Sequence, residues 1–223
     1  AFEIYRWPLT VGEYAEAVGM ETRPLAAVVG NWKHLDEQTR EQLLEYLRRT
    51  TRLAIPADWE RQVRLPPNRP VVGVSWFDAM TYCAWMQYRV NQNVVICLPT
   101  DSQWERAARN GRSPPRRKED DYPWRGPFDP TRANTAESEI GTTTAVGCFP
   151  GGHTRGGAWD MAGNVWELCA DKLHRYRAVR GGSFCDYAHV ARCSFTAGTI
   201  LDDGGYFSGF RPARFATPAP PSN

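Results

Sequence analysis

The sequence predicts an α+β fold in one domain, and three observations lead to this prediction. Start and stop signals of helices gather before residue 111, whereas short strand-like runs and long loops follow it, and this segregation is typical of α+β domains. With 42% hydrophobic residues, the 223-residue chain is long enough to bury a sizeable core. No internal repeat or linker divides it. We therefore expect one domain over 1–215 and a disordered, Pro-rich tail over 216–223.

The first elements are indicated by local signals. The opening run AFEIY is strand-like. A helix is expected from Thr10, an N-cap with Glu13 three residues later, to Gly19, which is a helix-ending residue. A second helix is expected within 35–49, where leucines fall largely on one face and acidic residues precede basic ones.

Later elements follow the same rules. A third helix is expected over 74–90, capped by Ser75, and a short buried strand over 94–99. The next helix begins at the N-cap Thr100 and ends before Gly111. We expect Cys83 and Cys97, which lie in the apolar helix and strand, to be small core residues.

The second half is irregular in composition. Pro, Gly, Asp, Thr and Arg dominate residues 113–155, and unstructured stretches of this length are usually functional or supported by an ion. Near the end, RGGSF (180–184) and GFRPAR (209–214) read as strands. Between them lies a mixture of aromatic residues, cysteine, aspartate, histidine and glycine. It could be a catalytic site, a binding surface or an ordinary loop.

Composition excludes several classes of protein. The net charge of +2 gives no general field for nucleic acid, and no apolar run is long enough to insert into a membrane. The six cysteines contain no CxxC pair and the four histidines are scattered, which argues against structural zinc. The 24 arginines against 3 lysines suggest a GC-rich genome and are compatible with a thermophile.

The cellular location is left open by the sequence. The chain starts without Met and without a signal peptide, so we expect an upstream segment. Both the cytoplasm and a cell or phage surface, reached through that segment, remain possible locations.

Five segments in order resemble the formylglycine-generating enzyme and sulfatase-modifying domain family. They are WPLTVGEYAEAV, PVVGVSWFDAMTYCAWM, LPTDSQWERAARNG, AVGCFPGG with WDMAGNVWE, and RGGSF with GFR. The resemblance covers almost the full length and implies a C-type lectin-like fold. This scaffold hosts enzymes and binding proteins alike, so the fold does not decide the activity.

The resemblance implies a Ca²⁺ site in one loop. Its ligands are two side chains and two carbonyl groups, at Asp160, Gly163, Val165 and Glu167. Mixed carboxylate and carbonyl oxygens suit this hard cation, whereas the alternative is that the two acids only bond loop amides. A second, weaker calcium site would use Asn134 and the carbonyls of Thr135 and Ile140, with Ser138 standing where Asp would be expected.

The family's oxidases resemble one another in a C-x₄-C pair a few residues after RGGS, which can hold Cu(I). Here the cysteines after Ser183 are Cys185 and Cys193, with seven residues between them. Neither this spacing nor their distance from Ser183 matches the oxidases. We therefore expect no copper. The related iron-dependent sulfoxide synthases need a further helical domain with a His-rich triad, which this sequence lacks.

A third branch of the fold comprises the variable proteins of diversity-generating retroelements, which carry a ligand-binding region between RGGS and GFR. Randomised adenines there cannot produce codons for Lys, Glu, Gln, Met or Trp. Residues 1–172 contain 35 of these five types. Residues 173–223 contain none, where proportional use would give roughly ten and strand composition accounts for part of the deficit.

The resemblance places the variable region at about 180–211. Its ligand-binding positions would be Cys185, Asp186, Tyr187, His189, Thr199, Ile200, Asp203, Tyr206 and Phe207, of which His189 is ambiguous. Tyr and Phe supply contact area at low entropic cost, as in antibody paratopes. We expect Phe184 and Phe210 to be core and Tyr206 and Phe207 to be exposed, with Tyr187 undecided.

The sequence thus predicts a non-enzymatic ligand-binding protein, diversified by a retroelement, whose partner is an unknown protein or surface ligand. Two alternatives remain. One is an oxidase of the formylglycine-generating type, or a regulatory relative whose copper site is degenerate. The other is a structural lectin-like module attached to an upstream segment.

Overall fold

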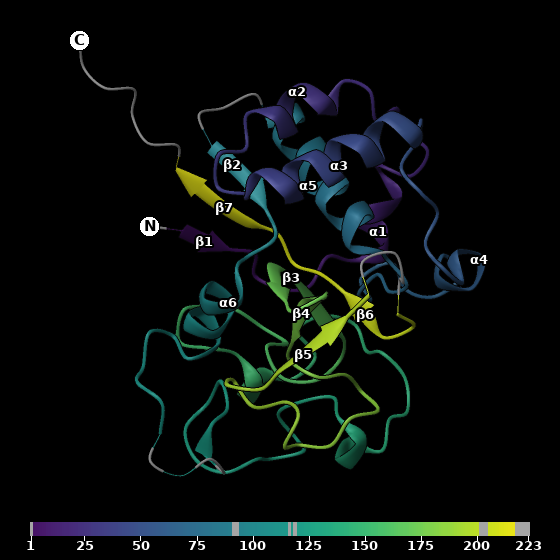
Figure 1. Cartoon of the computed structure of the whole chain (residues 1–223). Helices are drawn as coiled ribbons and strands as arrows, with labels where there is room; N and C mark the ends of the chain where they lie inside the picture. Colours follow the sequence, from purple (N-terminus) through teal and green to yellow (C-terminus); the bar gives the residue numbers. More distant parts are fainter. Residues whose placement is uncertain (1, 91–93, 116, 118–119, 201–204, 217–223) are drawn as a thin grey trace.

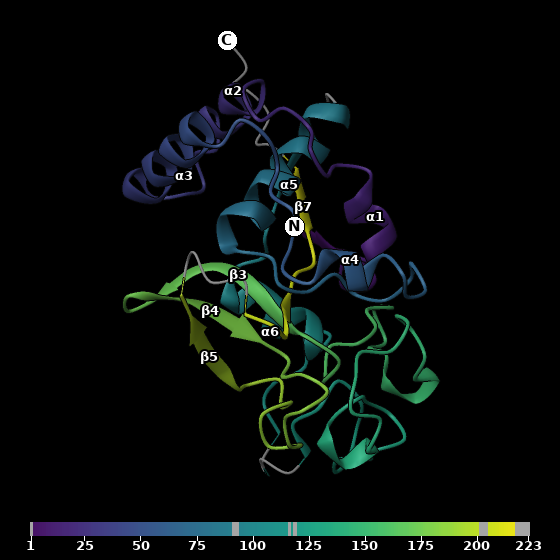
Figure 2. The same cartoon turned by 90° about the vertical axis from the view of Figure 1, so that its right-hand side faces the viewer.

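The computed structural model describes the chain except for residues 1, 91–93, 116, 118–119, 201–204 and 217–223. Most of the helices gather at one end of the molecule and the long loops at the other, with one of the two sheets between them (Figures 1 and 2). The α-helices are α1 (Val11–Ala15), α2 (Leu25–Gly30), α3 (Glu37–Arg49), α4 (Trp59–Gln62), α5 (Trp76–Val90) and α6 (Asp101–Ala108). The strands are β1 (Phe2–Ile4), β2 (Val94–Cys97), β3 (Trp166–Leu173), β4 (Tyr176–Arg180), β5 (Thr196–Thr199), β6 (Ser208–Gly209) and β7 (Ala213–Ala216).

Two of the predicted helix starts are confirmed by their caps. The Glu13 carboxylate accepts a hydrogen bond from the Thr10 backbone N–H at 2.8 Å, and Thr100 and Gln103 form the same box at the start of α6. The first helix is shorter than predicted, because α1 ends at Ala15 and turns follow it up to Gly19. The sequence interpretation also missed the short helices α2 and α4.

Two small sheets organise the strands. A three-stranded antiparallel sheet, in the order β1-β7-β2, joins both ends of the described chain. A four-stranded sheet has the order β5-β4-β3-β6, in which β6 runs parallel to β3. The second sheet lies between the helices and the loops, so both regions pack against it (Figure 2).

The prediction of a strand over 180–184 is wrong. β4 ends at Arg180 because Gly181 and Gly182 have φ values of 91° and 71°, in the left-handed region that a strand cannot accommodate. Added Cβ atoms would lie 3.2 Å from the Trp104 ring at Gly181 and 3.4 Å from the backbone at Gly182. The strand predicted over 209–214 is displaced, since β7 begins at Ala213 and continues to Ala216, the first residue of the predicted tail. The rest of that tail lies outside the described residues.

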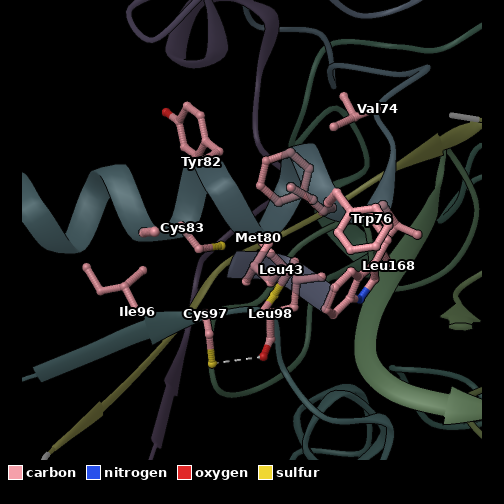
Figure 3. Close-up of a cluster of buried hydrophobic side chains, with 14 of the residues drawn as sticks. Leu43, Val74, Trp76, Met80, Tyr82, Cys83, Ile96, Cys97, Leu98 and Leu168 are labelled. Atoms are coloured by element: carbon pink, nitrogen blue, oxygen red, sulfur yellow. Dashed lines mark hydrogen bonds between the residues drawn. The ribbon is translucent and has the colours of Figure 1, made fainter. Parts of the chain in front are cut away.

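The main core lies between the helices and the two sheets. Side chains of α5 and β2 meet those of α3 and β3 there, as Figure 3 shows for Leu43, Trp76 and Leu168. Cys83 and Cys97 are 0% and 1% exposed, which confirms both as core residues. The core of the loop half is smaller and is divided into two clusters, one around Trp104 and one around Tyr122.

Candidate ligand-binding surface

A buried ion pair holds the C-terminal end of the candidate region in place. The Arg211 guanidinium donates to both carboxylate oxygens of Glu167 at 2.6 Å, and neither side chain is exposed. Trp104 Nε1 donates to the same carboxylate at 2.6 Å. The remaining Arg211 donors bind backbone carbonyls, at Tyr5 (3.1 Å) and Trp159 (2.8 Å) among others. The GFR motif is therefore a structural anchor that joins β3, α6 and the start of the chain.

A second buried arginine fixes the middle of the segment. Arg180 Nε donates to Asp101 Oδ1 at 2.6 Å, and Nη2 lies 3.2 Å from Glu105. Its Nη1 donates to the carbonyls of Cys193 (2.9 Å) and Phe195 (3.2 Å). Charge-assisted bonds of this kind are about twice as strong as neutral ones. The strand β4 thus determines where the chain runs after the loop over 183–192.

The loop over 183–192 is also held by residues outside the predicted variable region. Glu137 accepts from the Ala188 N–H at 2.8 Å, and the Tyr122 hydroxyl donates to the Ala188 carbonyl at 3.0 Å. Asp121 accepts from the backbone N–H groups of Cys193 and Ser194. These bonds use backbone groups of the segment, so its exposed side chains can change without breaking them.

The predicted variable side chains in this loop are directed differently. Cys185, Tyr187 and His189 are exposed, and Tyr187 is 63% exposed. Asp186 is turned inward, where its carboxylate accepts from the Ser183 N–H at 3.0 Å and from the Ser183 hydroxyl. The side chain of Asp186 therefore closes a turn, which makes it a poorer candidate for ligand contact than its neighbours.

The remaining predicted positions do not all lie together. Thr199 ends β5, and Ile200, which is 55% exposed, follows it at one edge of the four-stranded sheet. Tyr206 and Phe207 precede β6 at the opposite edge, and are 72% and 42% exposed. The expected exposure of these two aromatic residues is therefore confirmed. Asp203 lies outside the described residues.

Phe184 departs from its prediction as a core residue, whereas Phe210 is fully buried as expected. Phe184 is half-buried and meets the Phe207 ring edge to face, with the centroids 5.2 Å apart. Because the two positive-φ glycines end the strand early, Phe184 is carried out of the sheet. Together with Tyr206, these rings form one wall of a surface groove.

This groove has a volume of about 390 Å³, within the range of about 300–1,000 Å³ typical of ligand pockets. The rest of the lining comes mainly from residues 58–72 and 141–143. Sequence patterns gave no signal for this part of the groove. The lining residues outside the predicted region are Val11, Asp58, Arg61, Gln62, Leu65, Arg69, Pro70, Val72, Gly141, Thr142 and Thr143.

Both carboxylates of the calcium site expected at Asp160, Gly163, Val165 and Glu167 have hydrogen-bond partners within the protein. Both Glu167 oxygens accept hydrogen bonds from Arg211 or Trp104, so the Arg211 guanidinium stands beside this carboxylate. Asp160 accepts from the Gly147 N–H at 2.7 Å, and burial raises its pKa to about 6. Within the described ranges, no three His, Cys, Asp or Glu side chains gather to hold a metal.

The second calcium position is also occupied by internal bonds. The Asn134 amide nitrogen donates to the Thr142 carbonyl at 2.9 Å, and its oxygen accepts from the Ser138 hydroxyl at 3.3 Å. The same hydroxyl lies 2.7 Å from the Thr135 carbonyl oxygen, one of the expected ligands. Calcium at either place stays a prediction from the resemblance, without support from these contacts.

The two cysteines after Ser183, which were compared with the copper-binding pair of the oxidases, lie in different environments. Cys185 is exposed on the loop, with its sulfur 3.1 Å from the Ser183 hydroxyl. Cys193 is buried in the small core around Trp104, and burial raises the pKa of its thiol to about 12. Both are free thiols. An exposed and an interior thiol do not form a ready-made site for Cu(I).

The fold is that of a C-type lectin-like domain, in which two small sheets carry long loops. The chain belongs to the sulfatase-modifying factor enzyme 1-like domain family, whose family model matches residues 1–216. In the part of the chain that the structure describes, no helix is both long and apolar enough to cross a membrane.

Curated relatives include proteins with and without enzyme names. A formylglycine-generating enzyme of Streptomyces coelicolor is 40% identical over 67% of this chain and 54% of its own length. An inactive C-alpha-formylglycine-generating enzyme 2 of Mus musculus is 36% identical over 72% of this chain and 54% of its length. The chain therefore spans about half the length of these relatives.

Solved structures confirm the fold. PvdO from Pseudomonas aeruginosa superposes with a TM-score of 0.66 at 23% identity, covering 96% of this chain and 80% of that one. Variable protein 1 of Treponema denticola superposes with a TM-score of 0.63 at 18% identity, covering 95% and 84%. At these identities the likeness concerns the fold alone.

Proposed function

We propose that this chain is a non-enzymatic binding protein whose contact residues lie in the exposed part of 184–207 and are diversified by a retroelement. The main observation in support is that the backbone of this segment is fixed by other residues of the fold, whereas several of its side chains are exposed. Its backbone is held by Glu137, Asp121 and Arg180, while Tyr187 and Tyr206 extend into solvent. Such a surface can change its side chains and keep its shape.

Two further observations support the proposal. The absence of Lys, Glu, Gln, Met and Trp from residues 173–223 agrees with adenine-directed codon changes. A variable protein is also among the solved structures that share the fold. The partner that we propose is a protein or another surface ligand, since exposed aromatic side chains are common anchors of protein interfaces.

The test is deep sequencing of the DNA that encodes residues 180–211 in many sister cells. We expect amino-acid changes at the codons of Cys185, Tyr187, Tyr206 and Phe207, and none at Arg180, Gly182 or Arg211. A near-copy of this DNA beside a reverse-transcriptase gene is also expected. An invariant segment beside an active reverse transcriptase contradicts the proposal.

The enzyme alternative is favoured by relatives that carry the name formylglycine-generating enzyme. Its test is oxygen consumption by the copper-incubated chain with a cysteine-containing peptide. We expect none above a Cys185→Ser control, because Cys193 is an interior residue. Turnover that depends on both cysteines assigns the chain to the oxidases and overturns the binding proposal.

A further inference from the structure

The groove beside Tyr206 combines the proposed variable wall with a wall that lies outside the variable segment. The aromatic wall comes from Phe184, Tyr206 and Phe207. The same groove is also lined by Arg61 on α4 and by Arg69 in the segment that follows it. A ligand in the groove therefore has both aromatic rings and guanidinium groups within its lining.

The two walls are held in register by internal bonds. The buried Gln62 side chain bonds Ala57 and Val72, with its nitrogen 2.7 Å from the Ala57 carbonyl. The Gly73 N–H donates to the Ser208 carbonyl at 3.1 Å, one residue beyond Phe207. The bond between Gly73 and Ser208 joins two backbone groups, so this link between the two parts of the groove does not depend on the proposed variable side chains.

The guanidinium groups are free to meet a ligand. Arg61 is exposed, Arg69 is half-buried, and neither forms an ion pair with a described residue. Arg69 makes one long contact, 3.5 Å from the Thr142 hydroxyl. Among the described lining residues Asp58 is the single acidic one, so the groove has a positive excess.

We propose that this groove selects protein segments that place an acidic side chain beside an apolar or aromatic one. This proposal rests on the proposed binding function. Arginine pairs with carboxylates through two parallel hydrogen bonds, and the rings supply apolar contact. The arginines lie outside the variable segment, so they set the class of ligand. The aromatic positions then decide which member of that class binds.

The test uses a random-peptide phage library selected on the whole chain, with the enriched peptides measured by fluorescence anisotropy. The variants are Arg61→Gln with Arg69→Gln, Tyr206→Ser with Phe207→Ser, and, as the matched charge control, Arg64→Gln at an exposed arginine outside the groove lining. We expect peptides rich in Asp or Glu beside apolar residues. Each of the two double variants should bind the peptides at least about tenfold more weakly than wild type does. Replacing the acidic residue of the peptide by its amide should weaken binding to wild type but not to the double arginine variant.

The outcomes separate the two proposals. If the enriched peptides lack a carboxylate and bind the double arginine variant as well as wild type, the acidic ligand class is overturned. The proposed function still holds in that case if the double aromatic variant binds these peptides more weakly. Equal binding to wild type and to the double aromatic variant, or a selection that enriches no peptide, contradicts both proposals. Equal competition by a single-stranded oligonucleotide assigns the arginines to phosphate groups and likewise overturns the acidic class.

Discussion

The two ends of this molecule are stabilised in different ways. In the helical half, large apolar side chains of α3 and α5 fill a continuous core. In the loop half the apolar clusters are small, and ion pairs of the buried residues Arg109, Arg180 and Arg211 stabilise the structure in addition. Arg109 binds the carboxylates of Glu105 and Asp121. Arg180 and Arg211 bind backbone carbonyls as well as carboxylates, which suits a region with many backbone groups outside helices and strands.

This difference supports the exchangeable surface that we propose for the loop half. An apolar core ties stability to the volume of each side chain, so a change of residue is costly. In the loop half, stability depends instead on a frame of a few buried charged residues and the backbone that they hold. Exposed side chains such as Tyr187 and Tyr206 then contribute little to the free energy of unfolding, and this is what allows them to vary.

The largest effect that we expect comes from breaking this frame. Arg211→Met leaves the buried Glu167 carboxylate without its charged partner, although Trp104 Nε1 still donates to it, and should lower the free energy of unfolding by about 3–5 kcal/mol. Chemical denaturation measures the loss. Arg48→Ala, which removes an exposed pair with Glu45, is the control and should cost at most about 1 kcal/mol.

Leu43→Ala sharpens the comparison between the halves. Leu43 is fully buried in the helical core, and truncation there should cost about 2–5 kcal/mol. A loss for Arg211→Met near that of Arg48→Ala would show that the apolar clusters alone stabilise the loop half.

A smaller effect depends on pH. Burial raises the pKa of Asp160 from 3.8 to about 6, so its protonated form is favoured in the folded state. The stability that this group contributes is complete below about pH 4 and is lost as the pH rises through about 6. Compared with wild type, Asp160→Asn should therefore gain up to roughly 3 kcal/mol between pH 4 and pH 7, measured by denaturation at each pH.

Calcium separates this interpretation from the metal site that the resemblance implied. At neutral pH we expect added calcium chloride to leave the unfolding midpoint of wild type unchanged, because Glu167 is held by Arg211 and Trp104. A rise in wild type that is absent from Asp160→Asn would restore the calcium site.

Much of the fold could be predicted because its signals are local. The capping boxes at Thr10 and Thr100 and the apolar runs of α5 and β2 are contained in a few neighbouring residues each. The apolar pattern does not predict the early end of β4, where Gly181 has a left-handed backbone and lies close to the Trp104 ring, a residue far away in the sequence. Contacts between residues distant in sequence decide such positions.

The candidate site was predictable in part for the same reason. The segment around Tyr187 and Tyr206 stands out by composition alone. The rest of the groove lining does not, because Arg61 and Arg69 lie more than a hundred residues away in the sequence and share the groove with this segment only through the fold. The role of Asp186 in closing a turn with Ser183 is likewise visible only in the geometry.

The smallest effect should be found at the exposed aromatic residues. Tyr187→Ser and Tyr206→Ser each remove a ring that is mostly in solvent, so the free energy of unfolding should change by no more than about 0.5 kcal/mol. Phe210→Ala, in the same part of the chain but fully buried, should cost about 3–5 kcal/mol in the same denaturation assay. A cost above about 2 kcal/mol at Tyr187 or Tyr206 would place that ring in the packing of the fold. The surface would then not be free to vary.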